Sequence, residues 1–161
     1  MTNVPTGVYR VNYGTSLPAD SYVASARVGR KDVLGGSIAI GNSSTGLLEI
    51  DVITPGAIVQ GSVVDEQNQP VRGAAVTLIP EVSKRGIAFR YGSATTDQDG
   101  HFVIRSIAPG EYKLFATDFG STSVWMNPDF VAKYESSGTT VVANTVKPSE
   151  VSLTRISSDR R

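Results

Sequence analysis

The sequence has no cysteine and only one histidine among its 161 residues. Without cysteine the chain forms no disulfide and offers no thiolate to a metal ion. A metal site built on His101 would need carboxylates as all of its other ligands. We therefore interpret His101 as an ordinary strand residue that follows a turn, and we expect no cofactor.

The sequence also lacks a dominant charge and a long hydrophobic run. Fifteen Lys and Arg residues balance fifteen Asp and Glu residues, and the basic residues form no long cluster. This pattern disfavours a nucleic-acid or anionic membrane partner. No segment approaches the roughly 18 apolar residues of a transmembrane helix, and none has the pattern of an export signal. We expect neither a nucleic-acid partner nor a transmembrane segment.

The sequence does contain short runs of branched residues separated by turn-forming residues, most clearly within residues 57–117. Branched side chains favour a pleated strand over a helix. Asp99-Gly100 between apolar runs is a hairpin signal, because glycine accepts a positive φ. Turns recur about every eight to twelve residues, which is typical of an antiparallel β-sandwich. The strands predicted here cover residues 58–64, 75–79, 93–96, 101–104 and 112–116.

Further strands and one helix are predicted on both sides of this stretch. Asn127 is a suitable N-cap, Pro128 a suitable first residue and Asp129 a favourable first-turn acid, so a short helix is expected over residues 128–136. We interpret it as a lid on the sandwich. The other strands predicted cover residues 7–13, 21–28, 37–40, 47–53, 139–143 and 150–156.

Three motifs in order resemble the carboxypeptidase regulatory-like domain family. They are G-x-V-x-D-x-x-x-x-P-V-x-G-A-x-V-x-L, T-T-D-x-D-G-x-F-x-I and I-A-P-G-x-Y-x-L. The matching residues are Gly61, Val63, Asp65, Pro70, Val71, Gly73, Ala74, Val76, Leu78, Thr95, Thr96, Asp97, Asp99, Gly100, Phe102, Ile104, Ile107, Ala108, Pro109, Gly110, Tyr112 and Leu114. The resemblance implies a transthyretin-like, or prealbumin-like, seven-stranded sandwich. It also implies an accessory module of secreted, periplasmic or cell-envelope proteins that carries no catalytic residues.

An internal repeat suggests how the chain is divided. The segment YRVNYGTSLPADSYVASARV parallels FVIRSIAPGEYKLFATDF, with Tyr9 matching Phe102 and Tyr22 matching Tyr112. We therefore interpret residues 1–55 as the second half of another copy of the module, residues 56–156 as the regulatory-like sandwich and residues 157–161 as a tail. Such a chain is expected to be a piece of a longer exported protein, with other domains of that protein as partners.

Catalytic and metal-binding patterns are weak. Asp97 and Asp99 resemble the start of a calcium loop, but Ala108 stands where the bidentate glutamate belongs. A turn is the favoured interpretation, and a weak surface calcium site at Asp97, Asp99 or Asp65 stays open. No G-x-S-x-G motif is present, and the histidine sets of enzymes that share this fold are missing. We expect no enzyme.

The aromatic residues decide between two hypotheses for the function of the chain. Trp125 lies beside the expected helix. Its ring either provides an exposed surface on which a sugar stacks or, more commonly, acts as a core plug, a buried side chain that fills the space beneath the helix. Phe89 and Tyr91 lie in the long loop after residue 80 and are further candidates for ligand binding. The first hypothesis is a non-catalytic spacer or protein-interaction platform, and the alternative is a carbohydrate-binding module that uses these aromatics on a polysaccharide.

Overall fold

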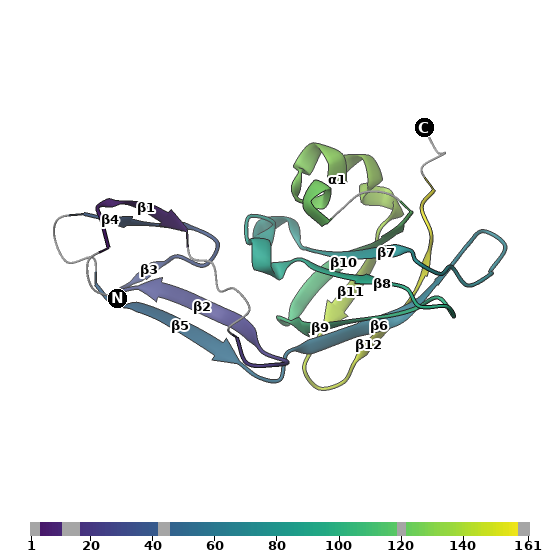
Figure 1. Cartoon of the computed structure of the whole chain (residues 1–161), viewed down its shortest axis with the longest axis horizontal. Coiled ribbons are helices and arrows are strands. Elements are labelled where there is room, and N and C mark those ends of the chain that lie inside the picture. The colour runs from purple at the N-terminus through teal and green to yellow at the C-terminus, as the bar shows by residue number, and fades with distance from the viewer. Residues whose placement is uncertain (1–3, 11–16, 42–45, 119–121, 158–161) are drawn as a thin grey trace.

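The computed structural model describes residues 4–10, 17–41, 46–118 and 122–157. The fold is mostly β with one short α-helix, and its strands form two lobes that lie side by side (Figure 1). The N-terminal lobe contains β1 (Gly7–Arg10), β2 (Tyr22–Val28), β3 (Lys31–Asp32), β4 (Ser37–Ile40) and β5 (Leu48–Ile53). The C-terminal lobe contains β6 (Ala57–Val64), β7 (Ala75–Pro80), β8 (Gly92–Thr95), β9 (His101–Ile107), β10 (Gly110–Thr117), α1 (Pro128–Tyr134), β11 (Thr139–Ala143) and β12 (Ser149–Thr154).

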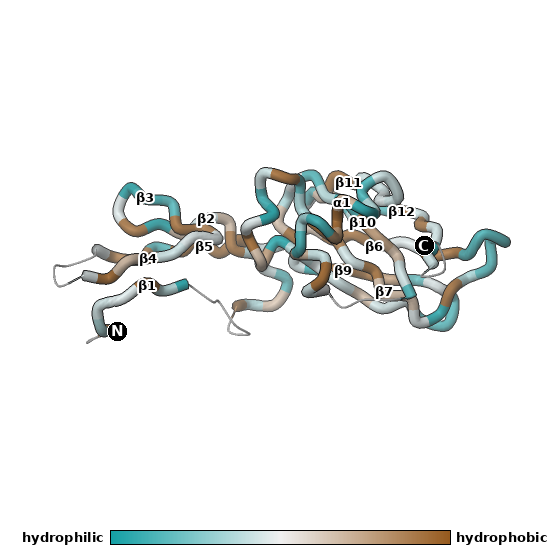
Figure 2. Tube along the Cα trace, turned by 90° about the horizontal axis from the view of Figure 1, so that it is seen from above, coloured by the Kyte–Doolittle hydropathy of each residue, from teal (hydrophilic) through white to brown (hydrophobic). Residues whose placement is uncertain are grey.

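The C-terminal lobe is a β-sandwich. One sheet has the order β11-β10-β7-β8 and the other has the order β12-β6-β9. Because alternate side chains of a strand point to opposite faces, both sheets direct apolar residues into one shared core. Figure 2 shows hydrophobic residues recurring along the strands of this lobe. Fully buried members of the core include Val59, Val63, Leu78 and Leu114.

The prediction of a wholly antiparallel sandwich is wrong at one pair of strands. β12 runs parallel to β6, with Val151 opposite Gly61. β12 does not follow β6 through a hairpin, which would force the two strands to be antiparallel. It arrives from β11 in the opposite sheet instead, so its direction is set by a crossing between the sheets.

A lid covers the outer face of the four-stranded sheet (Figure 1). It consists of α1, flanked by the 3₁₀ helices η3 (Thr122–Met126) and η4 (Glu135–Ser137). The Asn127 side chain caps α1 by accepting hydrogen bonds from the amides of Asp129 at 2.9 Å and Phe130 at 3.4 Å. The predicted helix and its cap are therefore confirmed, with η4 forming its last turn.

The N-terminal lobe is a smaller pair of sheets. The sheet β3-β2-β5 packs its apolar side chains with the two-stranded antiparallel sheet β1-β4 around Ala26, Val33 and Ile38. The short strand β3 pairs with the end of β2, with Lys31 opposite Val28. The predicted strand over residues 7–13 is described only as far as Arg10, and the predicted tail lies outside the described residues after Ser157.

The two lobes meet at a joint formed by loops. The amide of Gly56 donates a hydrogen bond to the Asp20 carbonyl at 2.6 Å. Gly35 lies against Ile87, so closely that an added Cβ would stand 2.6 Å from the Ile87 Cγ1 atom. Ile87 belongs to the long loop after β7, which contains the 3₁₀ helices η1 (Val82–Lys84) and η2 (Ala88–Arg90). Among the described residues, no helix has the length and apolar character needed to cross a membrane.

Candidate functional site

Two aspartates of the sequence motifs hold turns of the same design. Asp65 Oδ1 accepts hydrogen bonds from the amides of Gln67 and Gln69, both at 2.9 Å. Asp97 Oδ1 likewise accepts from the amides of Asp99 at 3.0 Å and His101 at 2.8 Å. Aspartate commonly forms such side-chain turns with its own backbone. The motif carboxylates therefore have a structural role at the ends of two strand pairs.

Two further motif residues also hold the backbone. The Thr96 hydroxyl accepts from the Ala74 amide at 2.9 Å and donates to the Val71 carbonyl at 2.6 Å. The buried Tyr112 hydroxyl donates to the Ala108 carbonyl at 2.7 Å. Burial raises the pKa of the Tyr112 phenol, so this hydroxyl stays protonated as a donor. The polar motif residues thus stabilise the sandwich.

The aspartates are not gathered with other metal-binding side chains. Within the part of the chain that the structure describes, no three His, Cys, Asp or Glu residues come together as a metal-ligand group would. Asp97 Oδ1 already receives two backbone amides. Weak calcium binding at Asp97, Asp99 or Asp65 stays a prediction that rests on the sequence pattern.

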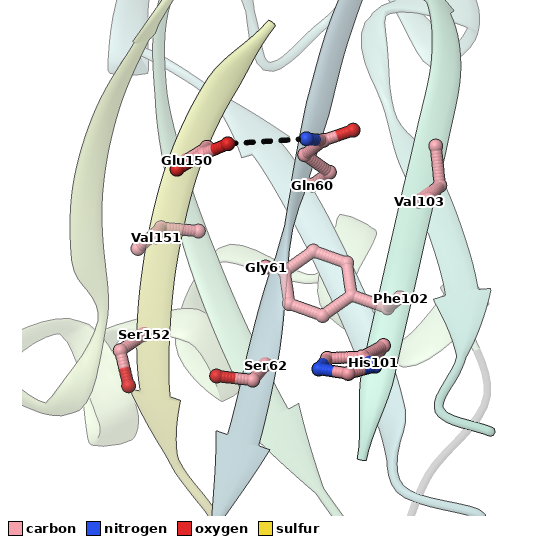
Figure 3. Close-up of a pocket in the computed structure, with 9 residues that line it drawn as sticks. All are labelled: Gln60, Gly61, Ser62, His101, Phe102, Val103, Glu150, Val151 and Ser152. Atoms are coloured by element: carbon pink, nitrogen blue, oxygen red, sulfur yellow. Dashed lines mark hydrogen bonds between the residues drawn. The ribbon is translucent and has the colours of Figure 1, made fainter. Parts of the chain in front are cut away.

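The outer face of the three-stranded sheet carries a shallow depression of about 520 Å³, lined by polar and apolar residues (Figure 3). Gln60 Nε2 donates to Glu150 Oε1 across β6 and β12 at 3.3 Å. The depression offers hydroxyl, amide, carboxylate and imidazole groups for hydrogen bonding. Its outward-facing lining residues are Gln60, Ser62, His101, Val103, Glu150 and Ser152. The depression was not predicted from the sequence, although the alternating polar residues of β12 and of the middle of β6 (Gln60 and Ser62) were a usable signal.

The aromatic residues near α1 form a cluster beneath the lid. Trp125 is 1% exposed and stacks on Phe115 of β10, with ring centroids 4.4 Å apart. Phe130 of α1 meets the same indole edge-on at 5.1 Å. This buried position of Trp125 agrees with its interpretation as a core plug beneath the helix. A ring buried in this way presents no face on which a sugar can stack.

An ion-pair cluster fastens the end of the lid to the sheet. Glu135 Oε1 lies 3.0 Å from Arg85 Nη2 and 2.9 Å from Lys113 Nζ. Lys113 also donates to the Glu135 carbonyl at 2.8 Å. Hydrogen bonds from Arg85 and then from Lys113 lower the pKa of the Glu135 carboxyl. The cluster joins the long loop, β10 and η4, and nothing in the local sequence indicates it.

Replacing Glu135 with glutamine is expected to destabilise the protein more at pH 7 than at pH 3. Because the folded-state pKa of Glu135 lies below the ordinary value of 4.5, its stabilisation is present above that value and is lost as the pH falls through the folded pKa. Partial exposure of the ion pairs keeps the effect modest and makes it smaller in high salt. Urea unfolding at both pH values measures the difference.

The matched control is Glu111→Gln, which changes an exposed carboxylate of β10. Glu111 forms none of the ion pairs seen among the described residues, so its replacement is expected to cost less stability at pH 7 than Glu135→Gln. Equal costs for the two variants at pH 7 would contradict the proposed contribution of the ion-pair cluster.

The two other aromatic candidates lie in the long loop. Phe89 is 38% exposed and belongs to η2. Tyr91 is half-buried, and its hydroxyl donates to the Arg85 carbonyl at 3.0 Å; burial raises the pKa of its phenol. The tyrosine therefore helps to hold the loop. Ligand binding by Phe89 and Tyr91 stays a prediction.

The geometry defines the class of protein as a β-sandwich module with an apolar interior and turns held by its motif residues. Comparison with known families agrees, since the carboxypeptidase regulatory-like domain matches residues 58–154. The chain belongs to this family. A search of curated proteins finds no match.

Several solved structures resemble the chain at low identity. The T6 backbone pilin of serotype M6 Streptococcus pyogenes is 13% identical over 66% of this chain and 20% of the pilin, with a TM-score of 0.37. A streptococcal ancillary pilin is 18% identical over 96% of this chain and 43% of its own, with a TM-score of 0.39. A Pseudomonas aeruginosa protein proposed to bind carbohydrate is 16% identical over 62% of this chain and 88% of its own, with a TM-score of 0.37. The chain thus spans less than half the length of both pilins.

Proposed function

We propose that this chain is a non-catalytic spacer module of a longer bacterial protein that is exported or held in the cell envelope. Membership of the regulatory-like family supports this role, since the family resemblance implies accessory domains in such proteins. The proposal is also supported by the structural role of the polar motif residues, whose side chains form hydrogen bonds with the backbone of the turns. In this proposal the chain sets the distance and orientation between the parts of the protein on either side of it.

The proposed organisation has a partial module at residues 1–55 and a transthyretin-like sandwich at residues 56–156. The internal repeat matches β1 and β2 with β9 and β10. In both cases the two consecutive strands belong to different sheets, as expected if both segments are the same part of one module. The N-terminal lobe has its own small core, which favours a separate unit over an extension of the larger sandwich.

The observation that carries the proposal is the joint between the lobes. The long loop of the C-terminal lobe brings Ile87 against Gly35, and the Gly56–Asp20 hydrogen bond ties down the connection between β5 and β6. Tyr91 and Arg85 hold the same loop from inside the larger lobe. A spacer needs a joint of this kind, because a flexible connection would not transmit distance or direction.

The joint can be tested by measuring a distance across it. The chain lacks cysteine, so single cysteines at the exposed positions Val8 in β1 and Val142 in β11 accept a pair of spin labels. Double electron–electron resonance is expected to give one narrow distance distribution. Ile87→Glu, which places a charge in the joint, is expected to broaden it.

Val82→Glu is the matched control, because Val82 is an exposed residue of the same loop. This variant is expected to keep the narrow distribution. A broad distribution in the unaltered protein, or equal broadening by both variants, would contradict a rigid joint and with it the spacer role.

A further inference from the structure

The strand β5 lies at the edge of the sheet β3-β2-β5. Among the described residues it pairs with β2 on one side, and no strand pairs with its other side. An edge strand presents backbone amides and carbonyls that can bind a further strand. β5 is six residues long, which is enough for several backbone hydrogen bonds with an added segment.

The side chains of β5 also remain accessible. Ile50, Val52 and Ile53 are 37%, 38% and 45% exposed, although branched apolar residues in a strand are commonly covered. Glu49 and Asp51 alternate with Ile50 and Val52 along the strand, and Ile53 shares the face of the two acids. The edge therefore offers Ile50 and Val52 on one face and the two carboxylates on the other.

The strand that already pairs with β5 shows which side chains complement it. In β2, Arg27 stands opposite Glu49 and Ser25 stands opposite Asp51. Arg27 Nη2 lies 3.1 Å from Asp51 Oδ2, and the Ser25 hydroxyl donates to the same carboxylate. These hydrogen bonds lower the pKa of the Asp51 carboxyl. A complementary strand therefore has donors or basic residues opposite the two acids.

A second copy of β5 does not meet this requirement. In an antiparallel pair centred on Ile50, Glu49 of one copy faces Asp51 of the other. Centring the pair on Asp51 places the two aspartates opposite each other, and a parallel pair in register opposes every acid with itself. Like charges directly opposite each other destabilise a sheet. The acids thus disfavour self-association of this edge in each of these three registers.

We propose that the free edge of β5 binds an extended peptide segment of another protein, in which apolar residues alternate with lysine or arginine. Backbone hydrogen bonds to the edge provide affinity, as in other cases of strand addition. The basic side chains face Glu49 and Asp51, and the apolar ones cover Ile50 and Val52. This interaction goes beyond the spacer role and does not depend on the rigidity of the joint.

The test uses the full chain and two capped seven-residue peptides. One alternates valine with lysine, and the other has glutamate in place of each lysine. Amide hydrogen exchange followed by NMR is expected to slow by on the order of tenfold at every second residue of β5 when the lysine peptide is present. The glutamate peptide is expected to leave these rates unchanged.

Charge reversal on the edge provides the second arm. Glu49→Lys is expected to weaken binding of the lysine peptide, while the matched variant Glu111→Lys, on the exposed surface of the other lobe, leaves it unchanged. The proposal is overturned if neither peptide slows exchange in β5, if both do so equally, or if the two variants respond alike.

Discussion

Trp125→Ala is expected to lower the free energy of unfolding by about 3–5 kcal/mol, the range typical of a large aromatic residue removed from a core. Trp125 is 1% exposed and contacts Phe115 of the sheet as well as Phe130 and Tyr134 of α1. Its removal leaves a cavity between the lid and the sheet, because the rings around it are attached to two separate elements. Urea unfolding followed by far-ultraviolet circular dichroism measures the loss.

Phe89→Ala is the control for this experiment, since Phe89 is an aromatic residue of the same lobe that is 38% exposed. Its cost is expected to be well below that of Trp125→Ala, because much less apolar surface is buried there. Trp125→Phe is expected to fall between the two. A loss below about 1 kcal/mol for Trp125→Ala would contradict the role of the indole as the plug beneath the lid.

Gly61→Ala is expected to destabilise the protein by about 1–3 kcal/mol, the usual cost of forcing an extra group into a packed interior. Gly61 lies in β6 opposite Val151 of β12, and a Cβ added to it would overlap the Val151 carbonyl oxygen. The obstructing atom is backbone, so relief requires the two strands to separate locally. Equilibrium unfolding in urea gives the change in free energy.

Gly86→Ala is the matched control, because a Cβ at Gly86 meets no atom within 4 Å. Alanine is expected to be neutral or slightly stabilising there, since it reduces the freedom of the unfolded chain. A cost for Gly61→Ala no larger than that for Gly86→Ala would show that β6 and β12 do not approach as closely as described.

Local signals predicted most of the elements. The turns at Asp65 and Asp97 depend on one side chain and the amides that directly follow it, so their residues are adjacent in the sequence. The cap at Asn127 acts over three residues, and the sequence revealed the helix for the same reason. Such interactions are readable because every participant lies within one short segment.

The candidate sites were less predictable because their members come from distant segments. Gln60 and Glu150 meet in the depression on the three-stranded sheet only because a crossing between sheets brings β12 beside β6. Arg85, Lys113 and Glu135 form one ion-pair cluster from a loop, a strand and the end of the lid. No periodic pattern connects such positions, so their proximity is a result of packing.

By itself, the sequence determined the family, the succession of strands along the chain, the turns and the capped helix, since these depend on neighbouring residues and on the alternation of apolar side chains. Only the tertiary structure decided the parallel pairing of β12 with β6, the burial of Trp125 and the position of β5 at the edge of its sheet among the described residues. These features depend on which surfaces of distant segments meet. That choice is made by the free energy of the whole packed molecule, in which the chain buries its apolar faces and satisfies its backbone groups together.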